Sequence, residues 1–297
     1  MNFHIKHIIA FIFVLLIGAS LSANVVVEAM ITMPFKKSNG LILIDAEVNG
    51  HKGSFIFDTG ANSILVNSRY FSNASNNKIE QMAFYTFNGQ VMGEALDIKS
   101  LTLGSLNLTD VEAYRSDLLK LEEITKHKLL GIIGAHLFEA DVMHIDNLNN
   151  KIEFSPRESI NAIANGRFLR SKIIVDNGFT LLPLEIENQY YNFCIDTGSS
   201  ISVIDSEVLK KHVHLLSSSK AAIKVQDADH QSSNTVYSID QVQISKLSIN
   251  ELSVAQKDLS DISFAFDNKV HGILSLDQLP IDNIIIDFKS EAIYFSY

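Results

Sequence analysis

The chain has 297 residues, of which 46% are hydrophobic and 20% are charged, with 4 Pro and 14 Gly. This composition excludes a disordered or collagen-like protein and suffices to build one large domain or two smaller ones. Lys and Arg number 24 against 34 Asp and Glu, so the net charge of -10 argues against nucleic acid as a partner.

An apolar run over residues 8–19 follows Lys6 and precedes the small residues at 20–23. A membrane-spanning helix needs about 20 apolar residues, whereas a shorter run followed by small residues is typical of an export signal. We therefore predict a signal peptide at 1–23 and an exported, periplasmic or secreted protein. The alternative is an uncleaved segment that tethers the chain to a membrane through residues 8–19, and only in that case do we expect a membrane partner.

The rest of the chain contains an internal repeat. A shift of 138 positions aligns residues 40–68 with 178–206 without a gap, and it superimposes Asp58-Thr59-Gly60 on Asp196-Thr197-Gly198. Repeats of solenoid proteins are about 20 to 50 residues long, so a repeat of this size indicates a duplicated lobe.

A second alignment extends the duplication. A shift of 141 positions aligns residues 131–155 with 272–296, so the two registers differ by only three residues. We predict an N-terminal lobe at 24–155, an inter-lobe connection at 156–177 and a C-terminal lobe at 178–297.

Each lobe is predicted to consist mostly of short strands, because its apolar segments are rich in β-branched and aromatic residues and bounded by Gly, Asn and Asp. In chain order the clearest strands are 41–48, 54–57, 101–103, 106–108, 181–186 and 192–195, and the helical candidates are 117–128 and 206–212. Gly104-Ser105 fits a two-residue hairpin turn. The chain is therefore expected to fold as two all-β lobes.

In both copies the Asp-Thr-Gly triplet follows an apolar strand, so the Asp lies at a turn between buried segments. The glycine permits a close approach that a side chain would prevent, and the threonine hydroxyl can bond across to the other copy. A pseudo-two-fold axis between the lobes would bring Asp58 and Asp196 face to face. Two adjacent carboxyl groups share one proton.

The two triplets, each followed about 75 residues later by an apolar, glycine-containing segment, resemble the active-site loops of aspartic proteases. The resemblance covers residues 40–155 and 178–297. It implies the bilobal acid-protease fold, with two pseudo-symmetric barrel lobes of a six-stranded type and the active site between them. It also implies a monomeric endopeptidase that needs no cofactor and acts on peptides or proteins. The alternative function is a non-catalytic peptide-binding protein or inhibitor trap on the same duplicated fold.

The resemblance assigns the catalytic roles to Asp58 and Asp196. Thr59, Gly60, Thr197, Gly198 and Ser199 would support them, with the threonines bracing the pair and the Ser199 hydroxyl donating to Asp196. Ala61 has no hydroxyl to donate to Asp58. This difference leads to the hypothesis that the working pH lies above that of a pair with hydroxyls on both sides.

A lid over the cleft is predicted at residues 84–92, where Asn88-Gly89 fits a two-residue hairpin turn. Tyr85 is the candidate flap tyrosine, and the alternative is an ordinary aromatic residue on a hairpin face. The substrate would bind as an added strand.

The remaining candidates have structural interpretations. Cys194 lies two residues before Asp196, on the same strand face, and is expected to be a buried small side chain rather than a nucleophile. The repeated pairs Asp141/Asp282 and Asp146/Asp287 are expected to form turns. His212 and His214 have no third ligand near them in the sequence, so no metal site is predicted.

Overall fold

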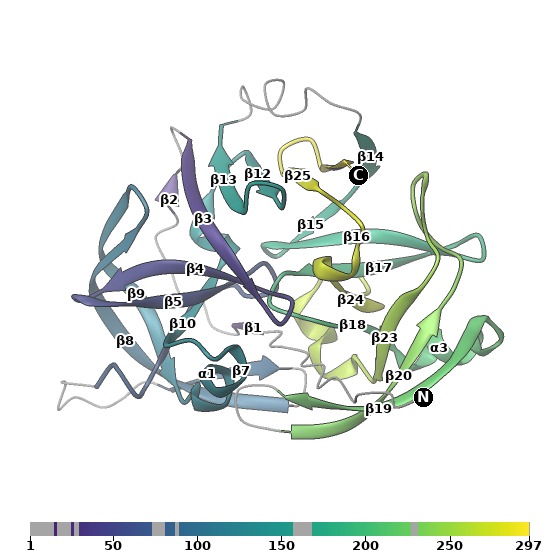
Figure 1. Cartoon of the computed structure of the whole chain (residues 1–297), viewed down its shortest axis with the longest axis horizontal. Helices are drawn as coiled ribbons and strands as arrows, with labels where there is room; N and C mark the ends of the chain where they lie inside the picture. The colour runs from purple at the N-terminus through teal and green to yellow at the C-terminus, as the bar shows by residue number, and fades with distance from the viewer. Residues whose placement is uncertain are drawn as a thin grey trace.

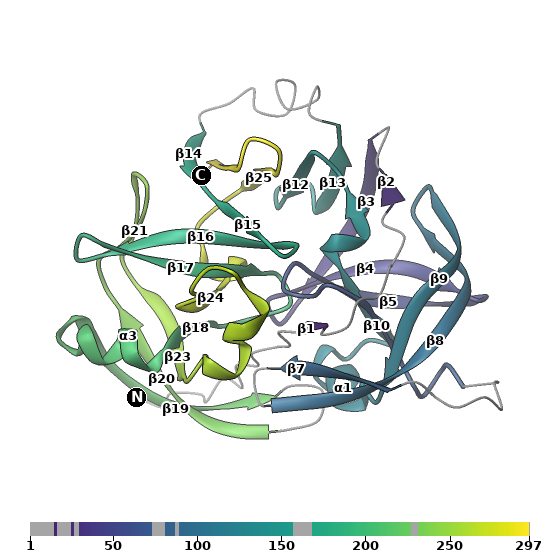
Figure 2. The ribbon, with the colours of Figure 1, turned by 180° about the vertical axis from the view of Figure 1, so that it is seen from behind.

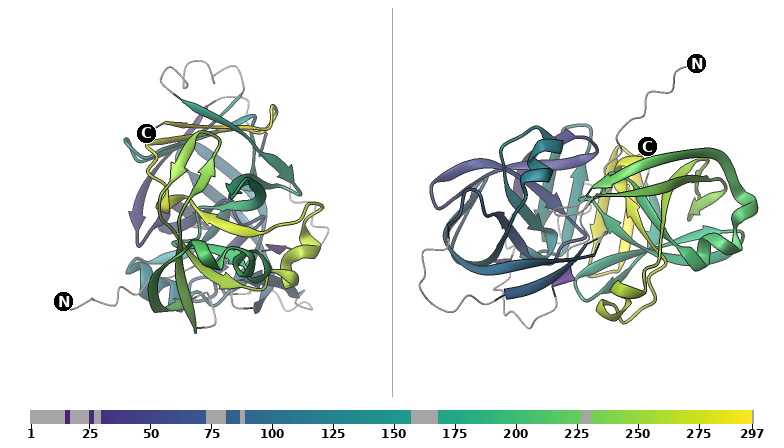
Figure 3. Two further views of the ribbon diagram at one scale, coloured as in Figure 1. Left: turned by 90° about the vertical axis from the view of Figure 1, so that its right-hand side faces the viewer. Right: turned by 90° about the horizontal axis from the view of Figure 1, so that it is seen from below.

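The computed structural model describes residues 15–16, 25–26, 30–72, 81–86, 89–156, 168–226 and 231–296. The predicted signal peptide lies outside these residues except for Leu15–Leu16. The described residues form two lobes side by side, the N-terminal lobe in purple to blue and the C-terminal lobe in green to yellow (Figure 1, Figure 3). The fold is all-β and bilobal, as predicted.

The N-terminal lobe is a sheet that curls into a barrel-like form. Its elements are β3 (Ile31–Ser38), β4 (Leu41–Val48), β5 (His51–Asp58), β6 (Ile64–Asn67), β7 (Gln81–Thr86), β8 (Gly89–Leu103), β9 (Leu106–Ser116), α1 (Leu119–Thr125), β10 (Leu129–Gly134), η1 (Ala135–Leu137), β11 (Phe138–Glu139), β12 (Val142–Asp146) and β13 (Lys151–Ser155). Strand β10 pairs in parallel with β5 and antiparallel with β6. It therefore lies between the strand that ends at Asp58 and the strand that follows the Asp58 loop.

The C-terminal lobe repeats this arrangement. Its elements are β14 (Leu169–Lys172), β15 (Ile174–Asp176), β16 (Phe179–Ile186), β17 (Gln189–Asp196), β18 (Ser202–Asp205), α3 (Ser206–Lys211), η3 (Val213–Leu215), β19 (Leu216–Gln226), β20 (Gln231–Ile239), β21 (Val242–Ile244), β22 (Leu247–Ile249), β23 (Leu252–Lys257), η4 (Ser260–Ala265), β24 (Gly272–Ser275), η5 (Leu276–Gln278), β25 (Asn283–Asp287) and β26 (Ala292–Ser296). Strand β24 pairs in parallel with β17 and antiparallel with β18. The duplication found in the sequence is thus a duplication of topology.

A seam sheet joins the lobes, in the order β3-β13-β12-β25-β26-β14. It lies at the top of Figure 1, where β12 and β13 of one copy approach β25 of the other. Its central pair is β12 with β25, which are equivalent strands of the two copies and run antiparallel. The pseudo-two-fold axis therefore passes through this pair.

The strands around each Asp are buried on both faces, which explains their continuous apolar runs. Phe55 and Phe57 point into the main core, whereas Ile56 belongs to a separate apolar cluster on the opposite face. In the C-terminal lobe, Phe193 and Ile195 are in the main core and Cys194 is in a separate cluster. Because side chains two residues apart share a strand face, the cluster of Ile56 lies on the same sheet face as Asp58, and the cluster of Cys194 lies on the same sheet face as Asp196.

Several predicted elements are present. The hairpin around Gly104-Ser105 joins β8 to β9, and the helical candidates form α1 and α3 with shorter bounds. Asp146 and Asp287 accept hydrogen bonds from Asn149 and Ser290 in equivalent turns, as expected of structural residues. Within the predicted connection, residues 157–167 lie outside the described part, while β14 pairs with β26 in the seam sheet.

Two short strands come from the N-terminal region. β1 (Leu15–Leu16) pairs antiparallel with β7, and β2 (Val25–Val26) pairs in parallel with β11. Viewed from behind, β1 lies between the lobes, next to β7 (Figure 2). None of the helices in the described ranges is long and apolar enough to span a membrane.

Candidate active site

Asp58 and Asp196 are the last residues of the equivalent central strands β5 and β17. The neighbouring strand places Gly134 opposite Asp58 in one lobe and Ser275 opposite Asp196 in the other. Both carboxyl side chains are fully buried. The predicted catalytic pair therefore lies at matching positions in the interior of the molecule.

The two threonines bind the loops to each other. The Thr59 hydroxyl donates to the Ile195 carbonyl at 2.9 Å and accepts from the Thr197 N–H at 3.1 Å. In the symmetric arrangement, the Thr197 hydroxyl donates to the Phe57 carbonyl at 2.8 Å and accepts from the Thr59 N–H at 3.0 Å. These four hydrogen bonds join the two loops across the pseudo-two-fold axis, at the residues next to the aspartates, which agrees with the bracing predicted for the threonines.

The two glycines allow the carboxyl groups to approach. A Cβ atom added to Gly198 would lie 2.3 Å from Asp58 Oδ2, and one added to Gly60 would lie 2.9 Å from Asp196 Cγ. Each carboxyl group therefore lies against the glycine of the opposite loop, in space that any side chain at that position would occupy. This packing brings Asp58 and Asp196 face to face.

The hydrogen bonds around the carboxyl groups are incomplete. The N–H groups of Gly60 and Gly198 donate at 2.7 Å to the Oδ1 atoms of Asp58 and Asp196, respectively. The two Oδ2 atoms are buried and receive no hydrogen bond from any other described residue, while the two carboxyl groups hydrogen-bond to each other. Buried polar atoms are rarely left unpartnered, and at a functional site such atoms are available to a bound water or substrate.

Burial raises the pKa of Asp58 to about 7, although the adjoining Asp196 carboxyl and the N–H groups of Gly60 and Gly198 act to lower it. Burial and the negative charge of Asp58 raise the pKa of Asp196 well above its usual range. Two carboxyl groups in one buried site cannot both ionise readily, so the pair retains a proton near neutral pH.

The role predicted for the Ser199 hydroxyl is wrong. This hydroxyl donates to the Ile201 carbonyl at 2.6 Å, so its single hydrogen is not available to Asp196. The backbone N–H of Ser199, rather than its side chain, acts to lower the pKa of Asp196. The hypothesis that Ala61 raises the working pH by lacking such a hydroxyl therefore loses its premise.

The predicted flap is a hairpin. Strands β7 and β8 pair with Tyr85 opposite Gln90 and Thr86 opposite Gly89. Asn88, in the connection at 87–88, lies outside the described residues, and the side-chain role predicted for Tyr85 stays a prediction. Phe84 is fully buried and its ring contacts Tyr114 at 5.2 Å between centroids. This contact fixes the β7 strand of the hairpin to the apolar cluster on the Asp58 face of the sheet.

Cys194 is fully buried, and burial together with the nearby aspartates raises the pKa of its thiol well above the usual range. A thiol that resists ionisation is a poor nucleophile, in line with the expected structural role.

Sequence reasoning missed Glu187, whose carboxylate contacts both His212 and His214 at 2.7 Å. Glu187 has a left-handed backbone, at φ 51°, in the two-residue turn that joins β16 to β17. The described part of the chain contains no cluster of His, Cys, Asp or Glu arranged to hold a metal ion.

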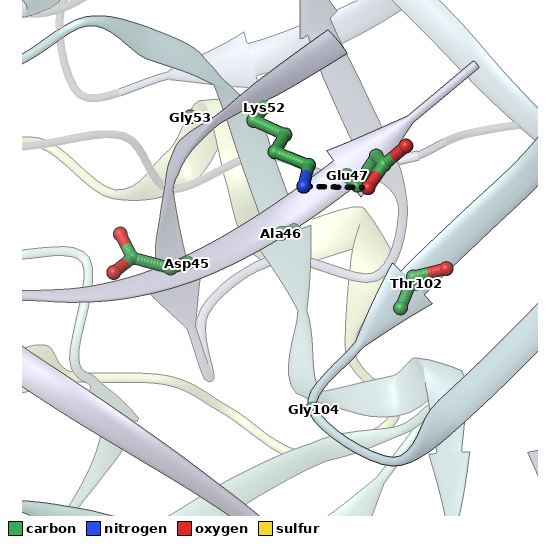
Figure 4. A pocket seen from close by; sticks show the side chains of 7 residues that line it. All are labelled: Asp45, Ala46, Glu47, Lys52, Gly53, Thr102 and Gly104. Carbon is green, nitrogen blue, oxygen red and sulfur yellow. Dashed lines mark ion pairs between the residues drawn. The ribbon is translucent and has the colours of Figure 1, made fainter. Parts of the chain in front are cut away.

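A surface cavity of about 370 Å³ lies on the N-terminal lobe, lined by Asp45, Ala46, Glu47, Lys52, Gly53, Thr102 and Gly104 (Figure 4). Its charged groups are already paired. Lys52 contacts Glu47 at 3.6 Å, and Asp45 accepts from Lys36 at 3.0 Å and Ser54 at 2.8 Å. The cavity therefore offers no free charged group comparable to the buried carboxylates.

Two family models match the chain. Residues 44–133 match the gag-polyprotein putative aspartyl protease family, and residues 182–277 match the aspartyl protease family. Each match contains one Asp-Thr-Gly loop. The chain therefore belongs to the aspartic proteases, as the resemblance in the sequence indicated.

Solved structures show the same fold. The aspartic proteinase from Irpex lacteus is 12% identical, with a TM-score of 0.53, 90% of this chain covered and 97% of the other. Basic 7S globulin from soybean is 10% identical, with a TM-score of 0.50, 91% of this chain covered and 95% of the other. The search of curated proteins gave no match. At these identities the structural similarity establishes the fold alone.

Proposed function

We propose that the chain is an aspartic endopeptidase in which Asp58 and Asp196 activate a water molecule between them. The observation that carries this proposal is the pair of buried carboxyl groups that hydrogen-bond to each other and whose Oδ2 atoms receive no hydrogen bond from any other described residue. These carboxyl groups are held together by the crossed threonine bonds and by packing against the opposite glycines. This arrangement provides a preorganised site for one water and one carbonyl oxygen.

The reaction begins with one proton on the pair. The ionised carboxylate takes a proton from the water as its oxygen attacks the peptide carbonyl carbon, and the protonated carboxyl gives its proton to the carbonyl oxygen. The tetrahedral diol collapses when the carboxyl that took the water proton gives it to the amide nitrogen, the other carboxylate takes a proton from a diol hydroxyl, and the C–N bond breaks, which returns the pair to its starting state. No covalent enzyme intermediate and no cofactor are needed.

The substrate binds as an extended strand beside the β7–β8 hairpin. The short strand β1 lies along β7, opposite Phe84 and Tyr85, which supports the ability of this strand edge to accept an added strand. Apolar clusters adjoin both aspartates, one containing Ile56, Ala61 and Phe84 and the other containing Cys194 and Ile201. We therefore expect apolar side chains on both sides of the cleaved bond.

The test is cleavage of a mixed peptide pool by a chain that begins at residue 24, measured between pH 3 and pH 8. Asp58→Asn and Asp196→Asn should each abolish cleavage, because Asn keeps the shape of the side chain but cannot carry the shared proton. Asp45→Asn, which changes an exposed aspartate of the same lobe, should leave cleavage unchanged. Cleavage that survives either dyad substitution would overturn the proposal, and binding without cleavage would favour the non-catalytic alternative.

We also propose that the protein is exported and that residues 1–23 are removed. The short apolar run at 8–19 followed by small residues supports this proposal. The measurement is the N-terminal sequence of the protein recovered from its native host. A mature N-terminus near residue 23 is expected, whereas an intact N-terminus in the membrane fraction would indicate a tethered form.

A further inference from the structure

Equivalent carbonyl groups in the two catalytic loops are held by different side chains. The carbonyls are those of Ala61 and Ser199, each three residues after its catalytic aspartate. The Ser199 carbonyl accepts a hydrogen bond of 2.6 Å from the hydroxyl of Ser275, which is fully buried. The Ala61 carbonyl faces the Nδ1 atom of His136 at 3.2 Å. The same point in both loops is thus fixed, in one lobe by a hydroxyl and in the other by an imidazole.

The local backbone explains the exchange. Gly134 is the counterpart of Ser275, and a Cβ atom at Gly134 would lie 2.3 Å from the Ala61 carbonyl oxygen and 2.6 Å from His136 Nδ1. No side chain can therefore occupy position 134, and the His136 ring fills that space from two residues further along the chain. In the other lobe the counterpart of His136 is Asp277, whose carboxylate pairs with Lys37 at 3.0 Å.

The chemistry of His136 suits a donor to a carbonyl. Burial lowers the pKa of His136 to about 4, although the hydrogen bond with Ala61 acts to raise it. Above that pH the ring is neutral and carries one N–H group. A carbonyl oxygen only accepts, so the bond to Ala61 requires this hydrogen to be on Nδ1.

We propose that His136 is a positioning residue for Asp58, a role that rests on the proposed peptidase function. By holding the Ala61 carbonyl, His136 fixes the turn from Asp58 to Ala61 and thereby aims the Gly60 N–H at Asp58 Oδ1, where the bond is 2.7 Å long. That N–H group acts to lower the pKa of Asp58. Loss of the His136 bond should therefore raise the pKa of Asp58 and move the acid limb of the activity profile to higher pH.

The experiment compares His136→Asn with His136→Leu. The side-chain amide of Asn can place an N–H close to the position of Nδ1, whereas Leu has a similar size and no donor. We expect His136→Leu to lower kcat at least about tenfold with KM nearly unchanged, and to shift the acid limb upward by about half a pH unit or more. His136→Asn should stay within about threefold of the parent and keep its pH profile. If the two variants behave alike in kcat and in pH profile, the proposal is overturned.

A second readout does not depend on catalysis. The carboxyl carbon of Asp58, labelled with ¹³C and assigned by its absence from Asp58→Asn, can be titrated by NMR in each variant. The midpoint of the Asp58 titration should rise in His136→Leu and not in His136→Asn. The titratable neighbours Asp196 and Cys194 are the same in both variants, so they cannot cause a difference between them. If no variant cleaves any peptide, the proposed function fails, and this titration still decides the role of His136.

Folding defects are handled by a third variant. If His136→Leu does not fold, His136→Ala replaces it, because Ala also has no donor and adds no charge near Asp58. The same pH shift relative to His136→Asn is then expected. Equal Asp58 titrations in the Asn and Ala variants would overturn the proposal.

Discussion

One row of side chains across the seam sheet shows how the two lobes have diverged. Register places Thr32, Glu153, His144, Ile285, Tyr294 and Arg170 side by side on successive strands. The pseudo-two-fold axis passes between His144 and Ile285, so each residue of the first half has its counterpart in the second half. Thr32, Glu153 and His144, the first half of the row, form a hydrogen-bonded polar group. Ile285, the counterpart of His144 in the second half, is fully buried and apolar.

The polar half also reaches across the axis. His144 Nδ1 contacts Glu153 at 3.1 Å, and its Nε2 contacts the Asn283 side-chain oxygen at 2.9 Å. The Asn283 amide nitrogen donates to Ser296 at 3.0 Å, so its oxygen is the atom left for His144. Both ring nitrogens of His144 thus have a side-chain oxygen as partner, one from Glu153 and one from Asn283. The comparison teaches that the two copies keep the same residues in their Asp-Thr-Gly loops. They differ in the seam row, where the polar residues of one copy alone make the hydrogen bonds across the axis.

The largest expected effect concerns the two glycines, each of which packs against the aspartate of the opposite loop. Gly198→Ala should lower kcat/KM by about 10² to 10³-fold, because the new methyl group would displace Asp58 Oδ2, which lies 2.3 Å from where that methyl carbon would stand. Gly60→Ala should cost less, since its nearest contact is 2.9 Å. The measurement is steady-state cleavage of one peptide. Gly53→Ala, where the new methyl carbon would lie 2.7 Å from Leu130 Cγ rather than against an aspartate, is the control for the strain of an added methyl group.

The hydrogen bonds of Thr59 and those of Thr197 should contribute equally to the free energy of unfolding. Thr59→Val and Thr197→Val should each lower the free energy of unfolding by roughly 2 kcal/mol, because each removes two buried hydrogen bonds across the axis. Urea unfolding of the single and double variants measures this. The double variant should lose less than the sum, since the bonds form one network. Thr→Ser variants keep the hydroxyl and should lose less than the Val variants, and clearly unequal single losses would contradict the symmetry.

Sequence patterns revealed the features that repeat. Asp58 and Asp196 stood out because a gapless shift of 138 superimposes their triplets, and the hairpin at Gly104 followed from local turn chemistry. The bond from His136 to Ala61 left no such signal, because it depends on how a segment 75 residues away approaches the loop. The Ser199 prediction failed because its hydroxyl has a local carbonyl acceptor, at Ile201, two residues further on.

Glu153 provides a test of the polar half of the row. Burial acts to raise the pKa of Glu153, but hydrogen bonds from Lys151 and His144 outweigh it and the pKa is lowered from 4.5. Glu153→Gln should therefore lower the free energy of unfolding by roughly 1.5 kcal/mol at neutral pH. The loss should be complete above about pH 4.5 and shrink as the pH falls through the lowered pKa of the folded state.

Tyr294 is the counterpart of Glu153 in the C-terminal lobe and provides the matched control. Tyr294→Phe should change the free energy of unfolding by less than about 0.5 kcal/mol at any of these pH values. Denaturant unfolding at a series of pH values between 3 and 7 measures both variants. A constant difference between the parent and Glu153→Gln across this range would show that the charge of Glu153 contributes nothing.

The smallest effect concerns the β7–β8 hairpin of the N-terminal lobe and the β19–β20 hairpin of the C-terminal lobe. β1 pairs with β7 of the N-terminal lobe, whereas β19 of the C-terminal lobe pairs only with β20 among the described residues. In the proposed binding mode, residues 15–16 and a substrate strand would compete for the β7 edge. A chain that begins at residue 24 should cleave a given peptide with a kcat/KM roughly fivefold above that of the full chain, because about one net hydrogen bond no longer has to be displaced. The change should appear in KM rather than in kcat, and equal KM values for the two chains would show that the β7 edge is open in both.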